Sequence, residues 1–293
     1  MPFYKKKPFL VICITLLVVI SAIALIVTTS FHDVAIHLLS ADAIWVLLIV
    51  AAQSFAYWAY VIPYKMVFKM SFKEAKLHAF EGFQPLKAGS GFVYDMGLHK
   101  PLGAQARVYY LGIWEYAALA PAVLIAAIYA YINSSVPVPL SLPWIIGVPV
   151  GAALFVIGVS NRTRIAKFPR AHKLLDFMMG MLKDQDWQQM VLLIIGMAGY
   201  WTGEIFALWA SLQLFDIKLS WVALLIAYAT GYSLSRRSLP LGGAGIVLVS
   251  LSFSLHWVGA AMSVALLAAL AYQVSNLVTP FIYHRASTTF TNS

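Results

Sequence analysis

Long apolar segments separated by short polar connections follow one another along the whole chain. A helix needs about 20 predominantly apolar residues to cross a bilayer, and most of these segments approach or exceed that length. The pattern predicts an all-α polytopic membrane protein, with about seven or eight transmembrane helices in a single transmembrane domain over residues 1–293. The predicted helices cover residues 9–28, 43–62, 107–132, 144–159, 190–215, 219–234 and 260–283, with a shorter apolar segment at 246–258.

Lysine and arginine concentrate in alternate connections between these segments. Basic clusters lie at 5–7, 65–76 and 162–173, whereas the connections 30–42 and 133–139 contain neither residue. Because basic residues are retained on the cytoplasmic side of a membrane, we expect a cytoplasmic N-terminus. These juxtamembrane clusters also account for the formal charge of +9, so we expect anionic lipid and no nucleic acid as the partner.

Two of the cytoplasmic stretches have the pattern of surface helices. In 65–77, lysines recur every three or four residues with apolar residues between them, and an amphipathic stretch follows the basic cluster at 162–173 as far as about residue 189. A helix with one basic face and one apolar face lies in the membrane interface and does not cross the bilayer.

The strongest interruption of the apolar pattern is a broken segment at 235–258, which begins Ser-Arg-Arg-Ser-Leu-Pro-Leu-Gly-Gly-Ala-Gly. Proline and glycine disfavour an uninterrupted helix, and non-helical backbone at membrane depth survives only where protein buries it or where it lines an aqueous cavity. Guanidinium groups and backbone N–H groups both suit phosphate oxygens. We therefore expect an anionic headgroup to bind here, although the two arginines could instead mark the cytoplasmic end of a helix. The candidate residues are Arg236, Arg237, Pro240, Gly242, Gly243 and Gly245.

A second broken segment covers about residues 80–100. Its pattern Pro-Leu-x-Ala-Gly-x-Gly loosely echoes the Pro-Leu-Gly-Gly-Ala-Gly of the first. Paired broken segments in the two halves of a membrane protein indicate a binding site between pseudo-repeats. The candidates here are Lys87, Gly89 and Gly91, with the alternative that the lysine stem carries its charge to the interface.

Three further ionisable residues, Arg107, Glu115 and Glu204, lie within the apolar segments. A charge at membrane depth costs at least about 2.5 kcal/mol, so such a residue normally faces a partner or water. Arg107 and Glu115 share a helix face but are about 12 Å apart along it, too far to pair. Glu115 and Glu204 are the deeper pair, and the alternative to a functional role is a hydrogen bond between helices.

The sequence gives little indication of metal or cofactor chemistry. Cys13 is the only cysteine, so the chain can form neither an internal disulfide nor a cysteine metal site. The histidines lack a metal-ligand spacing, and there is no phosphate-loop signature. We therefore expect no metal and no cofactor, and we assign no catalytic residue.

The segment at 246–258 leaves two topologies open, because its length of about 13 residues is short for a crossing. If it is re-entrant, seven crossings leave the C-terminus outside. If it crosses a thinned bilayer, eight crossings leave His284 and Arg285 inside, as the charge rule favours. We favour the eight-crossing arrangement.

Through the broken segment at 236–245 and the architecture before it, the chain resembles the lysylphosphatidylglycerol synthase transmembrane-region family of flippase-like integral membrane proteins. The resemblance covers most of the chain and implies a multi-pass protein of the bacterial cell inner membrane. In related proteins this region accompanies a cytosolic aminoacyl transferase domain and is associated with moving the modified lipid between leaflets. This sequence contains no such domain, and it reads Gly-Ile-Val-Leu-Val at 245–249, where the family usually has a glutamate shortly after the last glycine.

These observations lead to a hypothesis of binding and translocation of an anionic phospholipid or a polyprenyl-phosphate-linked substrate. Lys87, Arg107, Arg236 and Arg237 would hold the phosphate, and Glu115 and Glu204 would line a polar path for a headgroup or a proton. One alternative is an intramembrane enzyme, such as a glycosyltransferase acting on a lipid-linked substrate, with Glu81 and Asp95 as the plausible acid pair. Another alternative is a lipid-binding accessory subunit. A separate cytosolic or membrane enzyme is a further candidate partner of the chain.

Overall fold

The structure is a computed structural model that describes residues 42–82, 102–161, 167–233 and 244–289, together with residues 23, 27 and 32. Its described part is all-helical and contains no strand, which confirms the predicted all-α class. Five of the described helices are long and apolar enough to cross a membrane. They are α3 (Ala43–Phe68), α6 (Leu102–Ile132), α7 (Val138–Ser160), α10 (Trp187–Gln213) and α13 (Met262–Thr289). The helix predicted at 9–28 lies outside the described residues except at positions 23 and 27.

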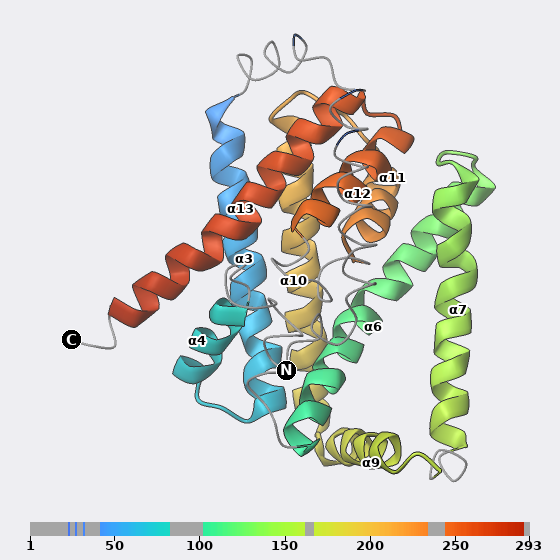
Figure 1. The fold of residues 1–293 in the computed structure, drawn as a ribbon, viewed down its shortest axis with the longest axis vertical. Helices are drawn as coiled ribbons and strands as arrows, with labels where there is room; N and C mark the ends of the chain where they lie inside the picture. Colours follow the sequence, from blue (N-terminus) through green and yellow to red (C-terminus); the bar gives the residue numbers. More distant parts are fainter. Residues whose placement is uncertain are drawn as a thin grey trace.

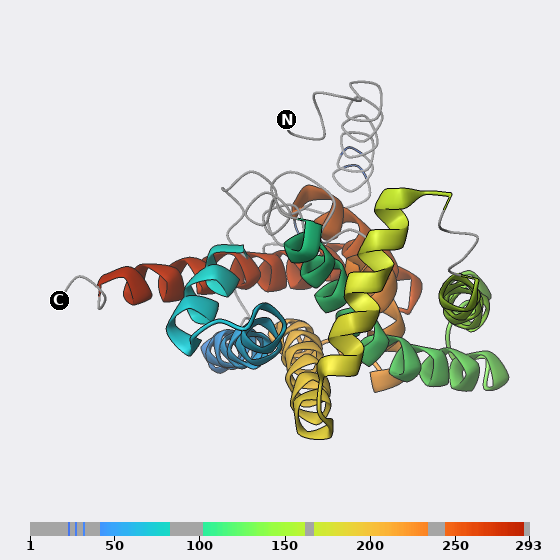
Figure 2. The ribbon, with the colours of Figure 1, turned by 90° about the horizontal axis from the view of Figure 1, so that it is seen from below.

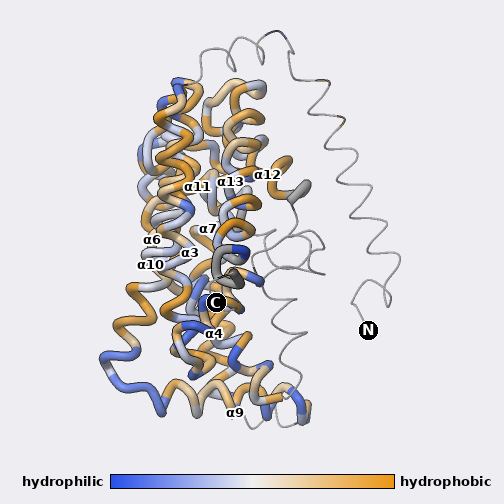
Figure 3. Tube along the Cα trace, turned by 90° about the vertical axis from the view of Figure 1, so that its left-hand side faces the viewer, coloured by the Kyte–Doolittle hydropathy of each residue, from blue (hydrophilic) through white to orange (hydrophobic). Residues whose placement is uncertain are grey.

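The long helices form a bundle with one distinctly polar end. Helix α9 (Pro169–Asp184) lies across that end, and α4 (Phe72–Gly82) lies near it (Figure 1). Hydrophilic residues gather around α4 and α9, whereas the helices beyond them are mostly hydrophobic (Figure 3). Seen from this end, α3 and α10 lie side by side, and α7 stands apart with α6 as its main neighbour (Figure 2). The bundle therefore has the distribution of apolar surface expected of a membrane protein.

Two short helices occupy the other half of the bundle, away from α9 (Figure 1). Helix α11 (Trp221–Tyr228) runs into a π-helical turn, η2 (Ala229–Ser233), and α12 (Ala244–Trp257) packs against that turn. The Ser250 hydroxyl donates a hydrogen bond to the Gly231 carbonyl oxygen, and a Cβ on Gly231 would lie 2.6 Å from the Leu251 Cα. At about 1.5 Å per residue, α12 with its 14 residues, and α11 with its 8 residues extended by the 5 of η2, are each about 20 Å long, less than the roughly 30 Å of a hydrocarbon core.

The prediction of one amphipathic helix at 65–77 is wrong. Helix α3 continues to Phe68, the chain turns at Lys69 with φ 54°, and α4 begins at Phe72. A capping box starts the new helix, because the Ser71 N–H and hydroxyl donate to the Glu74 carboxylate at 3.0 and 2.8 Å. The hydrogen bond from the Ser71 hydroxyl, together with that from the Ser71 N–H, lowers the pKa of Glu74 below its ordinary value.

Three other predicted boundaries also need correction. Residues 80–82, assigned to a broken segment, belong to α4. Helix α7 begins at Val138, within the predicted outer connection, because a proline in the first turn sacrifices no helical hydrogen bond. The amphipathic stretch expected to reach residue 189 ends at Asp184, since the Asp186 side chain accepts from the Gln189 N–H at 2.7 Å and begins α10.

A face of small residues brings α3 and α10 together. A Cβ on Gly203 would lie 2.7 Å from the Ala52 carbonyl oxygen and 2.8 Å from the Ala56 Cβ. A Cβ on Gly196, two turns earlier, would lie 2.5 Å from the Pro63 Cδ. Small residues allow the backbones of membrane helices to approach closely and gain van der Waals contact. Residues next to this face, among them Glu204, are therefore held against α3.

We predict that Gly203→Ala lowers the free energy of unfolding by about 1–3 kcal/mol, because the added methyl group overpacks a contact between two backbones. The matched control is Gly151→Ala on α7, where an added Cβ meets nothing within 4 Å. That change should be neutral or stabilise the helix by up to about 1 kcal/mol. Reversible unfolding of both variants in detergent measures the difference, and equal effects would contradict the assigned contact.

Candidate functional site

A group of polar side chains lies buried between α3, α10 and α13. Glu204 on α10 is fully buried, and its Oε2 accepts hydrogen bonds from Gln53 Nε2 at 3.3 Å and Asn276 Nδ2 at 3.1 Å. The Tyr272 hydroxyl donates to the same oxygen. A carboxyl inside a membrane is costly unless donors compensate for the lost water, and here three donors from two neighbouring helices do so. We call Gln53, Glu204, Tyr272 and Asn276 the buried polar cluster.

Regular helix geometry explains how the cluster forms. Tyr272 and Asn276 are four residues apart on α13 and therefore share a face, where Asn276 Nδ2 lies 3.3 Å from the Tyr272 hydroxyl oxygen. Tyr57 on α3 donates to the Asn276 carbonyl oxygen at 2.8 Å and joins α3 to α13 directly. Gly203 precedes Glu204 and brings α10 against α3, so the carboxyl reaches Gln53.

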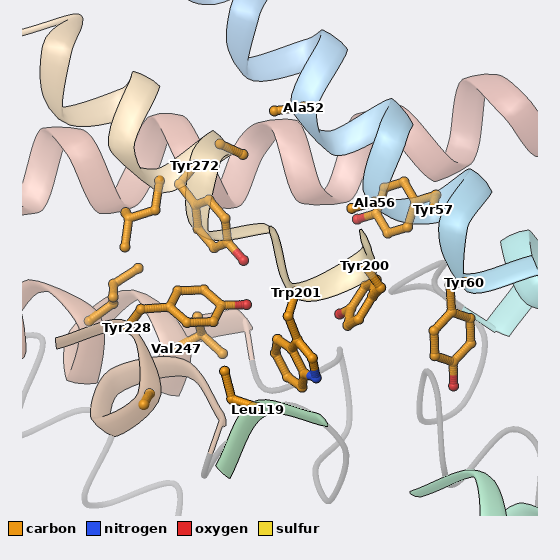
Figure 4. Packing of buried hydrophobic residues seen from close by; sticks show 14 of the residues in the cluster. Ala52, Ala56, Tyr57, Tyr60, Leu119, Tyr200, Trp201, Tyr228, Val247 and Tyr272 are labelled. Carbon is orange, nitrogen blue, oxygen red and sulfur yellow. The ribbon is translucent and has the colours of Figure 1, made fainter. Parts of the chain in front are cut away.

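Other aromatic side chains lie near Tyr272, one member of this cluster (Figure 4). Tyr228 of α11 meets Tyr272 edge to face, with ring centroids 6.2 Å apart, and meets Trp201 at 6.0 Å. In Figure 4 the Tyr228 and Tyr272 hydroxyls point into the same interior region. Trp201 Nε1 donates to the Glu115 carbonyl oxygen at 2.7 Å, which fixes α6 against α10. The interior is therefore polar at its centre and enclosed by large rings.

The two acids predicted to form the deeper pair are brought together. Glu115 on α6 is fully buried, and it lies close enough to Glu204 for the two carboxyls to interact electrostatically. Arg107 lies elsewhere, near the beginning of α6, where its Nη1 donates to the Phe68 carbonyl oxygen at 2.9 Å. The structure thus separates the two predicted acids from Arg107, the residue predicted to hold a phosphate.

Arg107 lines a pocket of about 1070 Å³ at the end of the bundle that carries α9. Lys69 and Lys173 add two more cations to its wall, and Asp176 and Asp184 add two acids. His172 Nε2 lies 3.3 Å from the Asp176 carboxylate, one turn away on α9. The rest of the wall is largely apolar, with Met66, Val67, Phe177 and Met181 from α3 and α9. We call this opening between α3, α6, α9 and α10 the basic pocket.

Most residues of the predicted broken segments cannot be placed in this geometry. Gly245 lies in the first turn of α12, so the backbone there is helical. The following predicted site residues lie outside the described residues: Lys87, Gly89, Gly91, Arg236, Arg237, Pro240, Gly242 and Gly243. Among the described residues, no three or more His, Cys, Asp or Glu side chains are grouped so as to hold a metal ion.

Sequence reasoning missed the partners of Glu204, which are Gln53, Tyr272 and Asn276. The two amides carry a signal that was available in the sequence, because each interrupts an apolar segment that is otherwise long enough to cross the membrane. Tyrosine carries no such signal, since it occurs widely in the membrane interface.

No protein-family model, curated protein or solved structure matches this chain. The resemblance to the lysylphosphatidylglycerol synthase transmembrane region therefore stays a prediction, and function has to be argued from the buried polar cluster and the basic pocket.

We predict that Tyr272→Phe lowers the free energy of unfolding by about 0.6–1.7 kcal/mol, the range of hydrogen bonds between membrane helices. The same change in a Glu204→Leu background should have a clearly smaller effect, because the carboxyl acceptor is gone and only the contact from Asn276 Nδ2 at 3.3 Å remains to be lost. Tyr131→Phe, at an exposed position near the end of α6, serves as the control. Unfolding in detergent is measured for the wild type, the two single variants, the double variant and the control, and an undiminished Tyr272→Phe effect without the carboxyl would contradict the assigned bond.

Proposed function

We propose that this chain is a flippase-like protein of the cell inner membrane that binds an anionic phospholipid or a polyprenyl-phosphate-linked substrate and moves it between leaflets. The observation that carries the proposal is the basic pocket, which combines three cationic side chains with an apolar wall of α3 and α9 residues. A lipid is complementary to this lining, because it carries an anionic phosphate close to its apolar chains. The mixed lining therefore suits an amphiphile better than a soluble anion.

Arg107 is the residue best arranged to hold a phosphate. Its hydrogen bond to the Phe68 carbonyl oxygen fixes the guanidinium at the wall of the pocket and uses one of five N–H donors. A fixed planar guanidinium can bind two phosphate oxygens at once, and little side-chain entropy remains to be lost on binding. Lys69 and Lys173 are both exposed and add attraction without fixed geometry.

The position of the basic pocket agrees with entry from the cytoplasmic leaflet. Helix α9 carries Arg170, Lys173 and Lys183, and it lies across the bundle as an interfacial helix would. By the charge rule this end of the bundle is cytoplasmic, and so is the N-terminus. Lipid headgroups at the cytoplasmic surface would then lie at the level of the pocket.

In this proposal, α11 and α12 form a re-entrant pair that enters from the outer side. Both lie in the half of the bundle opposite α9, and α13 then runs from that half toward α4 (Figure 1). This arrangement leaves the C-terminus on the cytoplasmic side, as in the eight-crossing alternative. Arg236 and Arg237 belong in sequence to the connection between the two short helices and stay candidates for a second phosphate contact.

Helix α6 connects the basic pocket with the interior. Arg107 lies near its beginning and Glu115 two turns further on, beside Glu204. A headgroup that moved from Arg107 along α6 would approach Glu115 and Glu204, which are both fully buried. Translocation along this helix would therefore require the closed interior to open.

We predict that anionic phospholipid is enriched among the lipids retained by the gently solubilised protein, and that Arg107→Gln and Lys173→Gln each reduce this enrichment several-fold. Loss of a charge-assisted contact of about 1.5–3 kcal/mol at Arg107 corresponds to a change of about tenfold or more, and loss of the exposed Lys173 charge to a smaller one. Lys173 is exposed, so its variant tests binding without disturbing the core.

Lys218→Gln is the matched control for this measurement, because Lys218 is exposed and lies in the turn between α10 and α11, at the end of the bundle opposite α9. Native mass spectrometry measures the retained lipid in all four proteins. Equal retention in the wild type and both pocket variants would overturn the assignment of the basic pocket as the headgroup site.

A further inference from the structure

Two buried oxygen atoms of the buried polar cluster accept no hydrogen bond from any residue that the structure describes. They are Glu204 Oε1 and Gln53 Oε1, and both side chains are fully buried. A buried acceptor without a donor costs about 1–3 kcal/mol, so two in adjacent residues need an explanation. The other atoms of the same two groups are joined to each other, since Gln53 Nε2 donates to Glu204 Oε2 at 3.3 Å.

We infer that Glu204 is a proton-binding site, in which Oε1 carries the proton and donates it to Gln53 Oε1. A carboxylic acid and a carboxamide placed side by side can form two complementary hydrogen bonds, from the amide N–H to one acid oxygen and from the acid O–H to the amide oxygen. The first of these bonds is present. An ionised carboxylate has only acceptors, so the two Oε1 atoms could not be joined, whereas one proton satisfies both.

The orientation of the amide follows from its neighbour. Only the NH₂ group of Gln53 can donate to Glu204 Oε2, which leaves the amide oxygen as the second atom of the pair. Oε2 already accepts from Tyr272 and Asn276 as well, so it has no remaining capacity. The proton therefore belongs on Oε1.

The groups that face Glu204 from each neighbouring helix are consistent with a proton bound to its carboxyl. Helix α3 contributes Gln53, and α13 contributes Tyr272 and Asn276, all as donors to Oε2. Helix α6 contributes Glu115, the acidic side chain among the described residues that acts electrostatically on Glu204. From α11, the titratable group on this side is Tyr228, which lies edge to face with Tyr272. An acidic neighbour gives the site a negative potential, which attracts a positive charge.

Reversible protonation here would act on helix packing. Release of the proton gives a carboxylate, returns the proton to water, and leaves Glu204 Oε1 and Gln53 Oε1 without a donor between α3 and α10. Uptake joins the two helices again. Coupling of this step to lipid movement rests on the proposed function, whereas proton binding itself does not.

Infrared spectroscopy tests proton binding through the difference between the spectra of full-length protein with unlabelled and with ¹³C-labelled glutamate, both in detergent. We expect the wild type to show the C=O band of a protonated glutamic acid at neutral pH, and Glu204→Gln to lose it. Glutamine has the shape of the protonated acid and can supply the same donor, so this variant should fold. Glu74→Gln, which removes an exposed carboxyl of α4, should retain the band. Gln53→Leu should shift the band, because the acid loses its acceptor.

Absence of the band in folded wild type, or its persistence in Glu204→Gln, would overturn the inference. Exchange of sodium for choline at constant pH should leave the unfolding midpoint unchanged, and a sodium-dependent rise that Glu204→Gln abolishes would mean that the site binds a metal cation and not a proton. These experiments need neither lipid nor transport. Their failure is therefore distinguishable from failure of lipid retention at Arg107, which tests the proposed function alone.

Discussion

The close contact between α3 and α10 is the constraint on which the rest of the structure depends. At Gly203 the two backbones are too close for even a methyl group, and the next residue is the buried Glu204. Membrane helices gain little from the hydrophobic effect, so close packing and hydrogen bonds must hold them together. Because the helices meet backbone to backbone, the Glu204 carboxyl reaches the Gln53 amide, and α13 contributes its own donors to the same oxygen.

The buried polar cluster and the basic pocket differ in charge and accessibility, so the α9 end of the bundle differs chemically from its interior. The pocket at the α9 end is open, and its wall combines three cations and two acids with apolar side chains. The interior cluster is closed and acidic, and aromatic rings enclose it. Helix α6 touches both, through Arg107 and Glu115. An anion would be attracted at the pocket and a cation in the interior, which is the arrangement expected when two ligands of opposite charge influence one another.

The sequence predicted the membrane helices well because hydropathy is a local property. The helices expected at 43–62, 107–132 and 190–215 are present with small shifts of their ends, and the burial of Glu115 and Glu204 followed from their position within apolar segments. Boundaries set by caps were harder to predict, since Lys69 and Ser71 end one helix and start another within a run of lysines that looks continuous. The two broken segments suggested by the sequence stay predictions, because most of their residues lie outside the described part.

The partners of Glu204 could not be predicted, because they depend on which faces of distant helices meet. Gln53 and Glu204 are 151 positions apart, and no local pattern connects them. The basic pocket was missed for the same reason, since Arg107, Lys69 and Lys173 come from three helices. Each residue has an ordinary local explanation as a juxtamembrane cation. Only the packing of α9 against α6 shows that the three line one opening.

The most direct test of this account is the rate at which the purified protein moves a fluorescently labelled anionic phospholipid between the leaflets of liposomes, with and without a proton gradient. The account predicts a rate well above that of protein-free liposomes, and a much lower rate for Arg107→Gln than for Lys218→Gln. A rate equal to that of protein-free liposomes under every gradient would contradict it.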